Sequence, residues 1–118
     1  MTATWHDVGR FSDLERDGYL IARVGGREIG VLATSVGLRA IRNRCPHHGG
    51  PLCRGTVSER IVGEPGRYRL TGRPMLRCPW HGWEFDIESG KCLDDDALRV
   101  AVYPVRIEDG RVLVRAET

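Results

Sequence analysis

Two short stretches rich in Cys, His and Gly constrain this chain more than any other feature of its sequence. CPHHGGPLC begins at Cys45 and CPWHGWEFD begins at Cys78, and thirty residues separate the two Cys/His pairs. The first stretch supplies Cys45-x-His47 and the second supplies Cys78-x-x-His81. Thiolate and imidazole groups at such close spacing suit zinc, copper or an iron–sulfur cluster. The spacing therefore predicts a fold in which two distant loops meet at one metal centre.

The division of ligands between the two loops favours one of these metals. Zinc modules usually group their cysteines in one loop and their histidines in another, whereas each loop here contributes one of each. A dinuclear cluster with unlike ends explains this mixed pairing, because one iron takes both thiolates and the other takes both imidazoles. That arrangement is the Rieske form of the 2Fe–2S centre. A structural zinc site, or a pair of turns that bind no metal, is the alternative.

The residue order of the two stretches also resembles that of a known family. CPHHGGPL and CPWHGWEFD resemble the two cluster-binding boxes of Rieske proteins, and the chain from Trp5 to Val114 resembles a whole Rieske ferredoxin domain. The tail ALRVAVYPVRIEDGRVLV is similar to the last strands of that family. The resemblance implies one Rieske 2Fe–2S cluster, held by the following four residues: Cys45 and Cys78 on the buried iron, and His47 and His81 on the outer iron.

Positions near these ligands indicate which kind of Rieske protein the chain resembles. High-potential Rieske proteins of respiratory complexes carry an extra disulfide between the two boxes, but the corresponding positions here are Gly50 and Trp80. Trp83 stands where those proteins place a hydrogen-bonding Ser. We therefore expect a potential toward the low end of the roughly −150 to +300 mV Rieske range. Cys53 and Cys92 do not occupy the disulfide positions, and we expect them to be buried free thiols.

The remaining loop residues are assigned from the same pattern. We expect Gly49, Gly50 and Gly82 to allow tight turns that present backbone N–H groups toward sulfur. The resemblance implies that Trp80 and Trp83 shield the cluster, with an ordinary core role as the alternative. Four ligands complete the cluster, so His48 and His6 are expected at the surface.

Alternating hydrophobicity and frequent turn residues predict an all-β fold, a sandwich or a barrel. A hairpin is expected from Tyr19–Val24 and Glu28–Thr34 across Gly25-Gly26, and Pro104 is expected at an edge or bulge. Other strands are predicted at Leu38–Asn43, Glu84–Ile87, Ala101–Ile107 and Arg111–Arg115, with one helical turn at Asp13–Asp17.

The resemblance narrows the fold class to a Rieske-type antiparallel β-sandwich with a small cluster-binding subdomain of two loops. We expect one domain over residues 1–118, with that subdomain at about residues 43–86. An insertion at about residues 55–74 makes the spacing between the boxes longer than in family ferredoxins. It is interpreted as a longer hairpin, or as a partner-recognition element with Arg67, Arg69 and Arg73 exposed.

Charge and composition limit the partners. A net charge of +2 argues against an electrostatic nucleic-acid binder. Residues 39–77 contain nine Arg against two acidic residues, whereas residues 86–96 contain five acidic residues and one Lys, so these are either opposed docking faces or two solvated loops. No secretory signal and no run near the ~18 apolar residues of a membrane span are present. We therefore expect a cytoplasmic protein that does not bind membranes.

The predicted function is that of a soluble one-electron carrier. The resemblance implies a ferredoxin, itself not an enzyme and monomeric in isolation, that passes electrons from a reductase to a terminal oxygenase or similar redox enzyme. An oxygenase would need a further iron held by two His and a carboxylate, and only His6 and His48 remain for it. The alternative is a small Rieske subunit or accessory domain of another redox complex, such as a nitrite reductase.

Overall fold

The computed structural model describes residues 3–34, 37–46, 49–62, 69–80, 82–95 and 97–117. Its elements, in chain order, are β1 (Ala3–Arg10), α1 (Phe11–Asp17), β2 (Tyr19–Val24), β3 (Arg27–Thr34), β4 (Gly37–Arg42), the 3₁₀ turn η1 (Leu52–Arg54), β5 (Thr56–Val62), β6 (Arg69–Arg77), β7 (Glu84–Asp86), β8 (Val102–Tyr103), β9 (Val105–Glu108) and β10 (Arg111–Glu117). They form three antiparallel sheets, with the strand orders β1-β10-β9, β2-β3-β4-β8 and β5-β6-β7. The predicted all-β antiparallel fold is confirmed.

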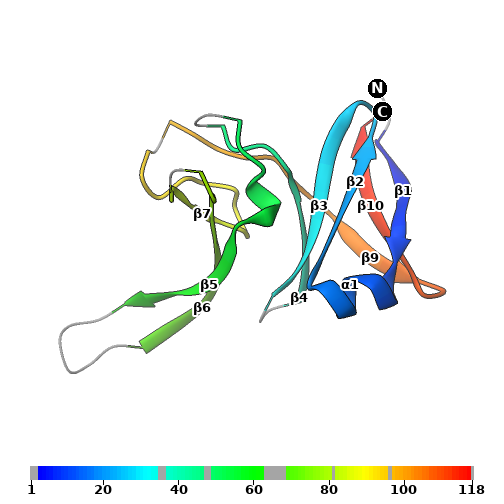
Figure 1. The fold of residues 1–118 in the computed structure, drawn as a ribbon, viewed down its shortest axis with the longest axis horizontal. Helices are drawn as coiled ribbons and strands as arrows, with labels where there is room; N and C mark the ends of the chain where they lie inside the picture. Colours follow the sequence, from blue (N-terminus) through cyan, green and yellow to red (C-terminus); the bar gives the residue numbers. More distant parts are fainter. Residues whose placement is uncertain are drawn as a thin grey trace.

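The sheet β2-β3-β4-β8 is the central layer, because it is covered on both faces (Figure 1). Side chains alternate across a strand, so neighbours in sequence point to opposite faces. Val31 and Ala40 belong to the first core, which the central sheet shares with α1 and β10. Leu32 and Ile41 belong to the second core, which contains all four cysteines of the chain. The central sheet therefore joins the sandwich to the layer that carries the Cys/His loops.

Local turn chemistry explains the start of the central sheet. Gly25 and Gly26 have φ values of 57° and 82°, which is the left-handed pair that a two-residue hairpin turn requires. The predicted hairpin is confirmed with β2 and β3 as its strands. The helix is longer than the single turn predicted: α1 begins at Phe11 and ends where Gly18, at φ 83°, donates its N–H to the Leu14 carbonyl at 2.7 Å. The helix thus starts two residues before the predicted Asp13, and Phe11 at this start packs against the first core.

Pro104 divides the predicted strand Ala101–Ile107 into two. Tyr103, before the proline, pairs with β4 in the central sheet, and Val105, after it, pairs with β10 in the outer sheet. Proline has no N–H to donate, so it fits the point at which the chain leaves one ladder for another. The expected edge position is confirmed, because β8 and β9 are edge strands of their sheets, and Pro104 lies where the chain crosses between them.

Two outcomes concern elements that the pattern left uncertain. β1 was not predicted, and it pairs with β10, a strand more than one hundred residues further along the chain. The inserted segment forms the hairpin β5-β6, as the simpler interpretation predicted, and this hairpin projects away from the rest of the molecule (Figure 1). Its turn, residues 63–68, and the side chains of Arg67, Arg69 and Arg73 lie outside the described residues.

Candidate metal centre

The two Cys/His loops share one backbone design. The first loop (residues 44–50) and the second loop (residues 77–83) read RCPHHGG and RCPWHGW. In the first loop the Cys45 N–H donates to the carbonyl five residues later, that of Gly50, at 2.9 Å, and the Cys45 carbonyl accepts the Gly49 N–H at 2.7 Å. In the second loop Cys78 makes the same two bonds, to the Trp83 carbonyl at 2.8 Å and from the Gly82 N–H at 3.0 Å. Two stretches far apart in sequence therefore hold their first cysteine in the same way.

A glycine in the left-handed region closes each loop. Gly49 has φ 77° and Gly82 has φ 71°, a conformation that residues with a Cβ adopt only at a cost of about 1–2 kcal/mol. Each glycine also lies beside the arginine that begins its loop. A Cβ added at Gly49 would be 3.4 Å from the Arg44 guanidinium, and one added at Gly82 would be 2.9 Å from that of Arg77. The predicted turn role of both glycines is confirmed.

Gly50 has a different role from the one predicted. Its backbone is not left-handed, so the turn does not require glycine at this position. A Cβ at Gly50 would instead lie 2.8 Å from the Trp80 ring, so the missing side chain makes room for the indole of the other loop. These are the two positions at which high-potential Rieske proteins carry their disulfide. Here an aromatic ring packed on a glycine joins the loops.

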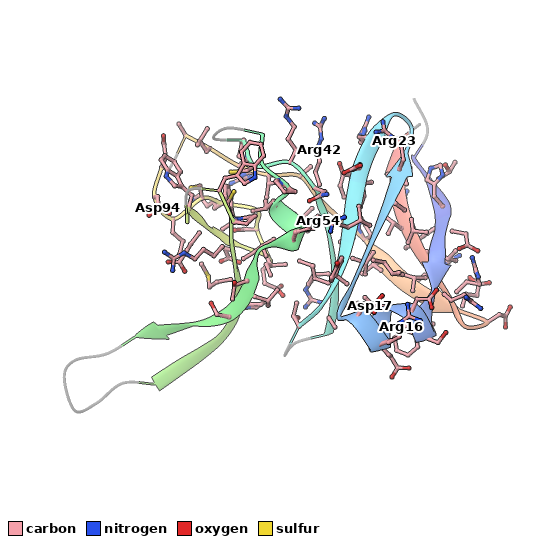
Figure 2. The ribbon with its side chains drawn as sticks, in the orientation of Figure 1. Arg16, Asp17, Arg23, Arg42, Arg54 and Asp94 are labelled. Carbon is pink, nitrogen blue, oxygen red and sulfur yellow. The ribbon has the colours of Figure 1, made fainter. Side chains whose placement is uncertain are left out.

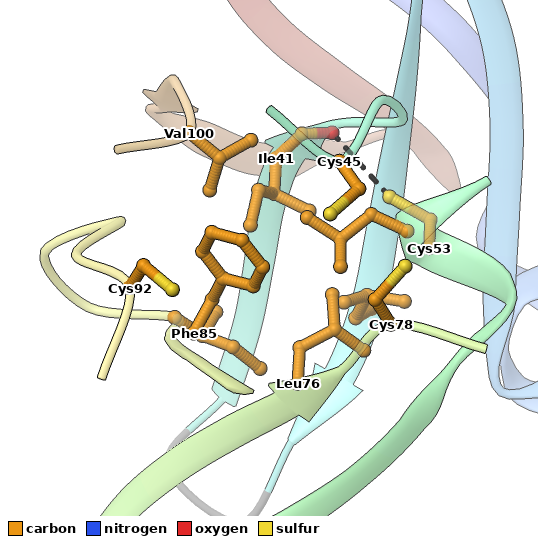
Figure 3. Close-up of a cluster of buried hydrophobic side chains, with 11 residues drawn as sticks. Ile41, Cys45, Cys53, Leu76, Cys78, Phe85, Cys92 and Val100 are labelled. Carbon is orange, nitrogen blue, oxygen red and sulfur yellow. Dashed lines mark hydrogen bonds between the residues drawn. The ribbon is translucent and has the colours of Figure 1, made fainter. Parts of the chain in front are cut away.

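Both loop cysteines are buried in the second core (Figure 3). Cys45 and Cys78 are each 2 % exposed, and they come from different loops into one cluster with Leu76 and Phe85. A hollow of about 490 Å³ borders Cys78 and Trp80. Two buried, soft sulfur donors that converge from matched loops suit an iron–sulfur cluster. The cysteine half of the predicted ligand set therefore fits the cluster.

The histidine half stays a prediction. His47, His48 and His81 lie outside the described residues, and among the residues that are described no group of three or more metal-binding side chains gathers. The residues next to two of them are described: Pro46, before His47, lies in the first loop, and Gly82, after His81, lies in the second. His6 lies elsewhere, on β1, where its Nε2 is 3.0 Å from the Thr4 hydroxyl.

The other two cysteines are buried free thiols, as predicted. Cys53, in η1, is 2 % exposed and its thiol donates to the Ile41 carbonyl at 3.5 Å. Burial raises the pKa of Cys53 to about 12, because the thiolate would lose its hydration. Gly30 supports this packing, since any side chain there would overlap Cys53. Cys92 is equally buried. Both therefore serve the core.

The two tryptophans differ in their surroundings. Trp83 is half-buried and packs against the second core, which supports the core alternative for this residue. Trp80 is 57 % exposed, although its ring contacts Gly50. Trp80 thus presents an aromatic surface to solvent directly beside the loops.

Asn43 is a supporting residue that the sequence pattern did not identify. It is 7 % exposed; its side-chain carbonyl accepts the Cys53 N–H at 2.8 Å and its side-chain amide donates to Glu28 at 3.0 Å. Its own backbone N–H donates to the Glu28 carbonyl at 2.9 Å. Buried polar groups need such partners. Asn43 therefore fastens η1 and β3 to the segment that leads into the first loop. A polar residue at the end of an alternating strand was the available signal.

Comparison with known proteins gives a consistent result. The model of the Rieske-like [2Fe-2S] domain family matches residues 4–115. Human apoptosis-inducing factor 3 is 30 % identical over 110 residues, which cover 92 % of this chain but only 16 % of that protein. The ferredoxin component of the naphthalene 1,2-dioxygenase/salicylate 5-hydroxylase systems of a Ralstonia species is 26 % identical, over 99 % of this chain and all of that protein.

A solved structure extends the likeness to the fold. A Mycobacterium tuberculosis protein described as the small subunit of an NADH-dependent nitrite reductase superposes with a TM-score of 0.80 at 24 % identity. The match covers 100 % of this chain and 99 % of that one.

Proposed function

Because the chain belongs to the Rieske-like [2Fe-2S] domain family, we propose that it is a one-electron carrier whose working group is one Rieske 2Fe–2S cluster. The observation that supports this most directly is the matched pair of loops, each of which brings one buried cysteine into the second core. We assign Cys45 and Cys78 to one iron, and His47 and His81 to the other. We treat residues 1–118 as one domain, with residues 43–86 as the cluster-binding part.

The chain's own residues define the environment of the cluster. Buried thiolates avoid solvent and oxidation, and the hydrogen bonds within each loop fix the direction in which Cys45 and Cys78 point. The cluster, when bound, takes up and releases a single electron. With two ferric ions, two sulfides, two thiolates and two neutral imidazoles, the oxidised cluster would carry no formal charge, and one electron would bring it to minus one. The arginines around the loops favour the reduced form through this added negative charge.

We propose that this carrier serves a reductase and an oxygenase or a similar redox enzyme, as a component of an oxidoreductase system and not as its catalyst. The likeness to a dioxygenase ferredoxin component over the full length of both chains supports this choice. The chain spans about 16 % of the length of the first curated relatives, so its role is argued from the domain alone. A second candidate is a small subunit of a nitrite reductase complex, which the superposition over both whole chains favours. No helix within the described residues is long and apolar enough to cross a membrane.

The first experiment combines metal analysis with two matched sets of cysteine variants. The purified protein should contain two irons and two sulfides per chain and show the visible absorption and electron paramagnetic resonance of a Rieske centre. C45S and C78S should lose the cluster. C53S and C92S, which change the same residue type in the same core, should keep it. A colourless protein with one zinc, or cluster loss in C53S as complete as in C45S, would contradict the assignment.

The histidine assignment needs its own variants. Replacing His47 and His81 together by Cys should keep an iron–sulfur cluster, because thiolates also bind iron. Its potential should fall, since four-cysteine clusters lie below Rieske centres. H48C is the matched control and should leave the potential unchanged. If H48C lowered the potential and the double variant did not, the outer ligands would have to be reassigned.

A further inference from the structure

Building on the proposed carrier function, we infer that an arginine-rich face beside the first loop docks a redox partner through a cluster of carboxylates on that partner. The arginine face consists of Arg23, Arg27, Arg42, Arg44 and Arg99. The residues come from β2, β3, β4, the start of the first loop and the segment before β8, and the fold brings them together. Figure 2 shows Arg23 and Arg42 at the same end of the molecule, opposite Arg16.

Two hollows give this face its shape. Each has a volume of about 350 Å³, and they meet along Arg42 and Arg44, which line both. Gly49 of the first loop borders one hollow and Pro46 borders the other. A side chain placed in either hollow would therefore lie beside the first loop, which contains Cys45. A partner that used these hollows would hold its own redox centre close to the cluster.

The charge of the face is largely uncompensated. Elsewhere, arginines pair with carboxylates: Arg16 with Asp17 at 3.0 Å, Arg39 with Glu88 at 2.7 Å and Arg111 with Asp7 at 2.8 Å. Within the part of the chain that the structure describes, no arginine of the arginine face has such an ion pair. The Arg23 guanidinium donates to the Gly26 carbonyl instead, at 3.2 Å.

The first hollow contains a single carboxylate, that of Glu28. This carboxylate accepts the Asn43 side-chain amide, and four arginines line the same hollow. Like charges gathered in this way repel one another and lower stability. The same gathered charge creates a positive potential. This potential attracts the carboxylates of a partner and can raise its association rate 10- to 1,000-fold.

The chemistry of the groups favours carboxylates of a protein partner. Guanidinium groups bind carboxylates through paired, parallel hydrogen bonds, and a hollow lined by several of them can hold more than one. Negative charge borders the second loop, because the Asp94 carboxylate accepts the N–H of Glu84, the residue directly after that loop. A basic face of limited extent, with carboxylates near the second loop, suits a folded acidic partner better than an extended polyanion.

The test measures binding of a fluorescein-labelled hexaglutamate peptide to the cluster-loaded protein by fluorescence anisotropy at low ionic strength. The main variant is R27E/R42E, which leaves Arg44 and its contact with Gly49 intact. The control is R16E/R115E, which changes the net charge by the same amount on α1 and β10. R27E/R42E removes two guanidinium groups and adds two carboxylates that repel the peptide, so it should weaken binding about tenfold or more. The control should weaken it by less than about threefold.

Several outcomes would overturn the proposal. Equal losses in both variants would show that only net charge matters. Tighter binding of polyuridylate than of hexaglutamate would point to nucleic acid, and displacement of the peptide by phosphate beyond the effect of ionic strength would point to a small anion. The neutral variant R27Q/R42Q keeps the test decisive if charge reversal disturbs folding. Visible absorption of each variant reports the cluster separately, so failed docking and failed carrier function are distinguishable.

Discussion

Three glycines with nearly the same backbone conformation allow the packing around the loops to be tested quantitatively. Gly110, Gly82 and Gly90 have φ values of 74°, 71° and 79°. An added Cβ would meet nothing within 4 Å at Gly110, the Arg77 guanidinium at 2.9 Å at Gly82, and the Val100 carbonyl oxygen, in hard overlap, at Gly90. Alanine at these positions therefore adds the same backbone strain but three different degrees of steric conflict.

The expected losses can be worked out step by step. Left-handed backbone costs alanine about 1–2 kcal/mol, and the loss of unfolded-state entropy returns about 0.4–1 kcal/mol, so G110A should lose about 1 kcal/mol. G82A should lose roughly 1 kcal/mol more, because the exposed Arg77 side chain can move at a modest cost. G90A should lose more than about 4 kcal/mol, since the new Cβ would overlap the Val100 backbone carbonyl, which cannot move aside as a flexible side chain can.

The assay is thermal unfolding of the cluster-loaded protein at one scan rate, followed by circular dichroism and by visible absorption. For 118 residues, 1 kcal/mol corresponds to about 4 °C in the midpoint. We expect midpoints to fall by about 4 °C for G110A and about 8 °C for G82A, with no cluster-loaded protein for G90A. In an R77A background, the difference between G82A and G110A should disappear. Equal losses for all three variants, or an unchanged difference without Arg77, would refute the steric argument.

Three further predictions test the surroundings of the centre. N43A removes the acceptor of a buried N–H, so it should lower stability by about 1–3 kcal/mol in thermal unfolding, and an unchanged midpoint would show that η1 is held by other contacts. Cys53, whose pKa is raised from 9.0 to about 12, should resist iodoacetamide at pH 8, because its thiolate fraction falls about a thousandfold. The folded state holds the Cys53 proton more tightly than the unfolded state does. The free energy of unfolding of the native protein should therefore fall above pH 9, relative to that of C53A, by up to about 1.4 kcal/mol per pH unit. Parallel curves of unfolding free energy against pH would contradict the burial argument. G50C/W80C should form a disulfide between the loops. A Cβ built at Gly50 lies 3.0 Å from the Cγ of Trp80, and the Cβ of Trp80 is one bond, about 1.5 Å, from that Cγ. Alkylation of both new thiols under oxidising conditions would refute the geometry.

Sequence alone was sufficient for features that depend on local chemistry. The order and spacing of Cys, His and Gly predicted two tight loops, and the left-handed conformations of Gly49 and Gly82 confirm the turns. The meeting of these loops at one metal centre stays a prediction. The Gly25-Gly26 hairpin followed from turn chemistry in the same way. Such features are predictable because each is decided within a few residues of the chain.

Pairing between distant segments was decided by the tertiary structure. β1 was missed because its partner, β10, lies at the other end of the chain. α1 starts two residues earlier than predicted, at Phe11, which packs against the first core. The pattern marked Asn43 only as a polar residue at the end of a strand; that it fastens η1 depends on side-chain partners from other elements.

The loops themselves show the same division. Their composition specified which residues could bind a cluster, but their mutual contact depends on the Trp80 ring that fills the space left by Gly50. The arginine face likewise exists only in the folded chain, because β2, β3 and β4 bring residues from separate stretches to one end of the central sheet. Ligand type is a property of single residues and their spacing, whereas contact and surface charge depend on which strands pair.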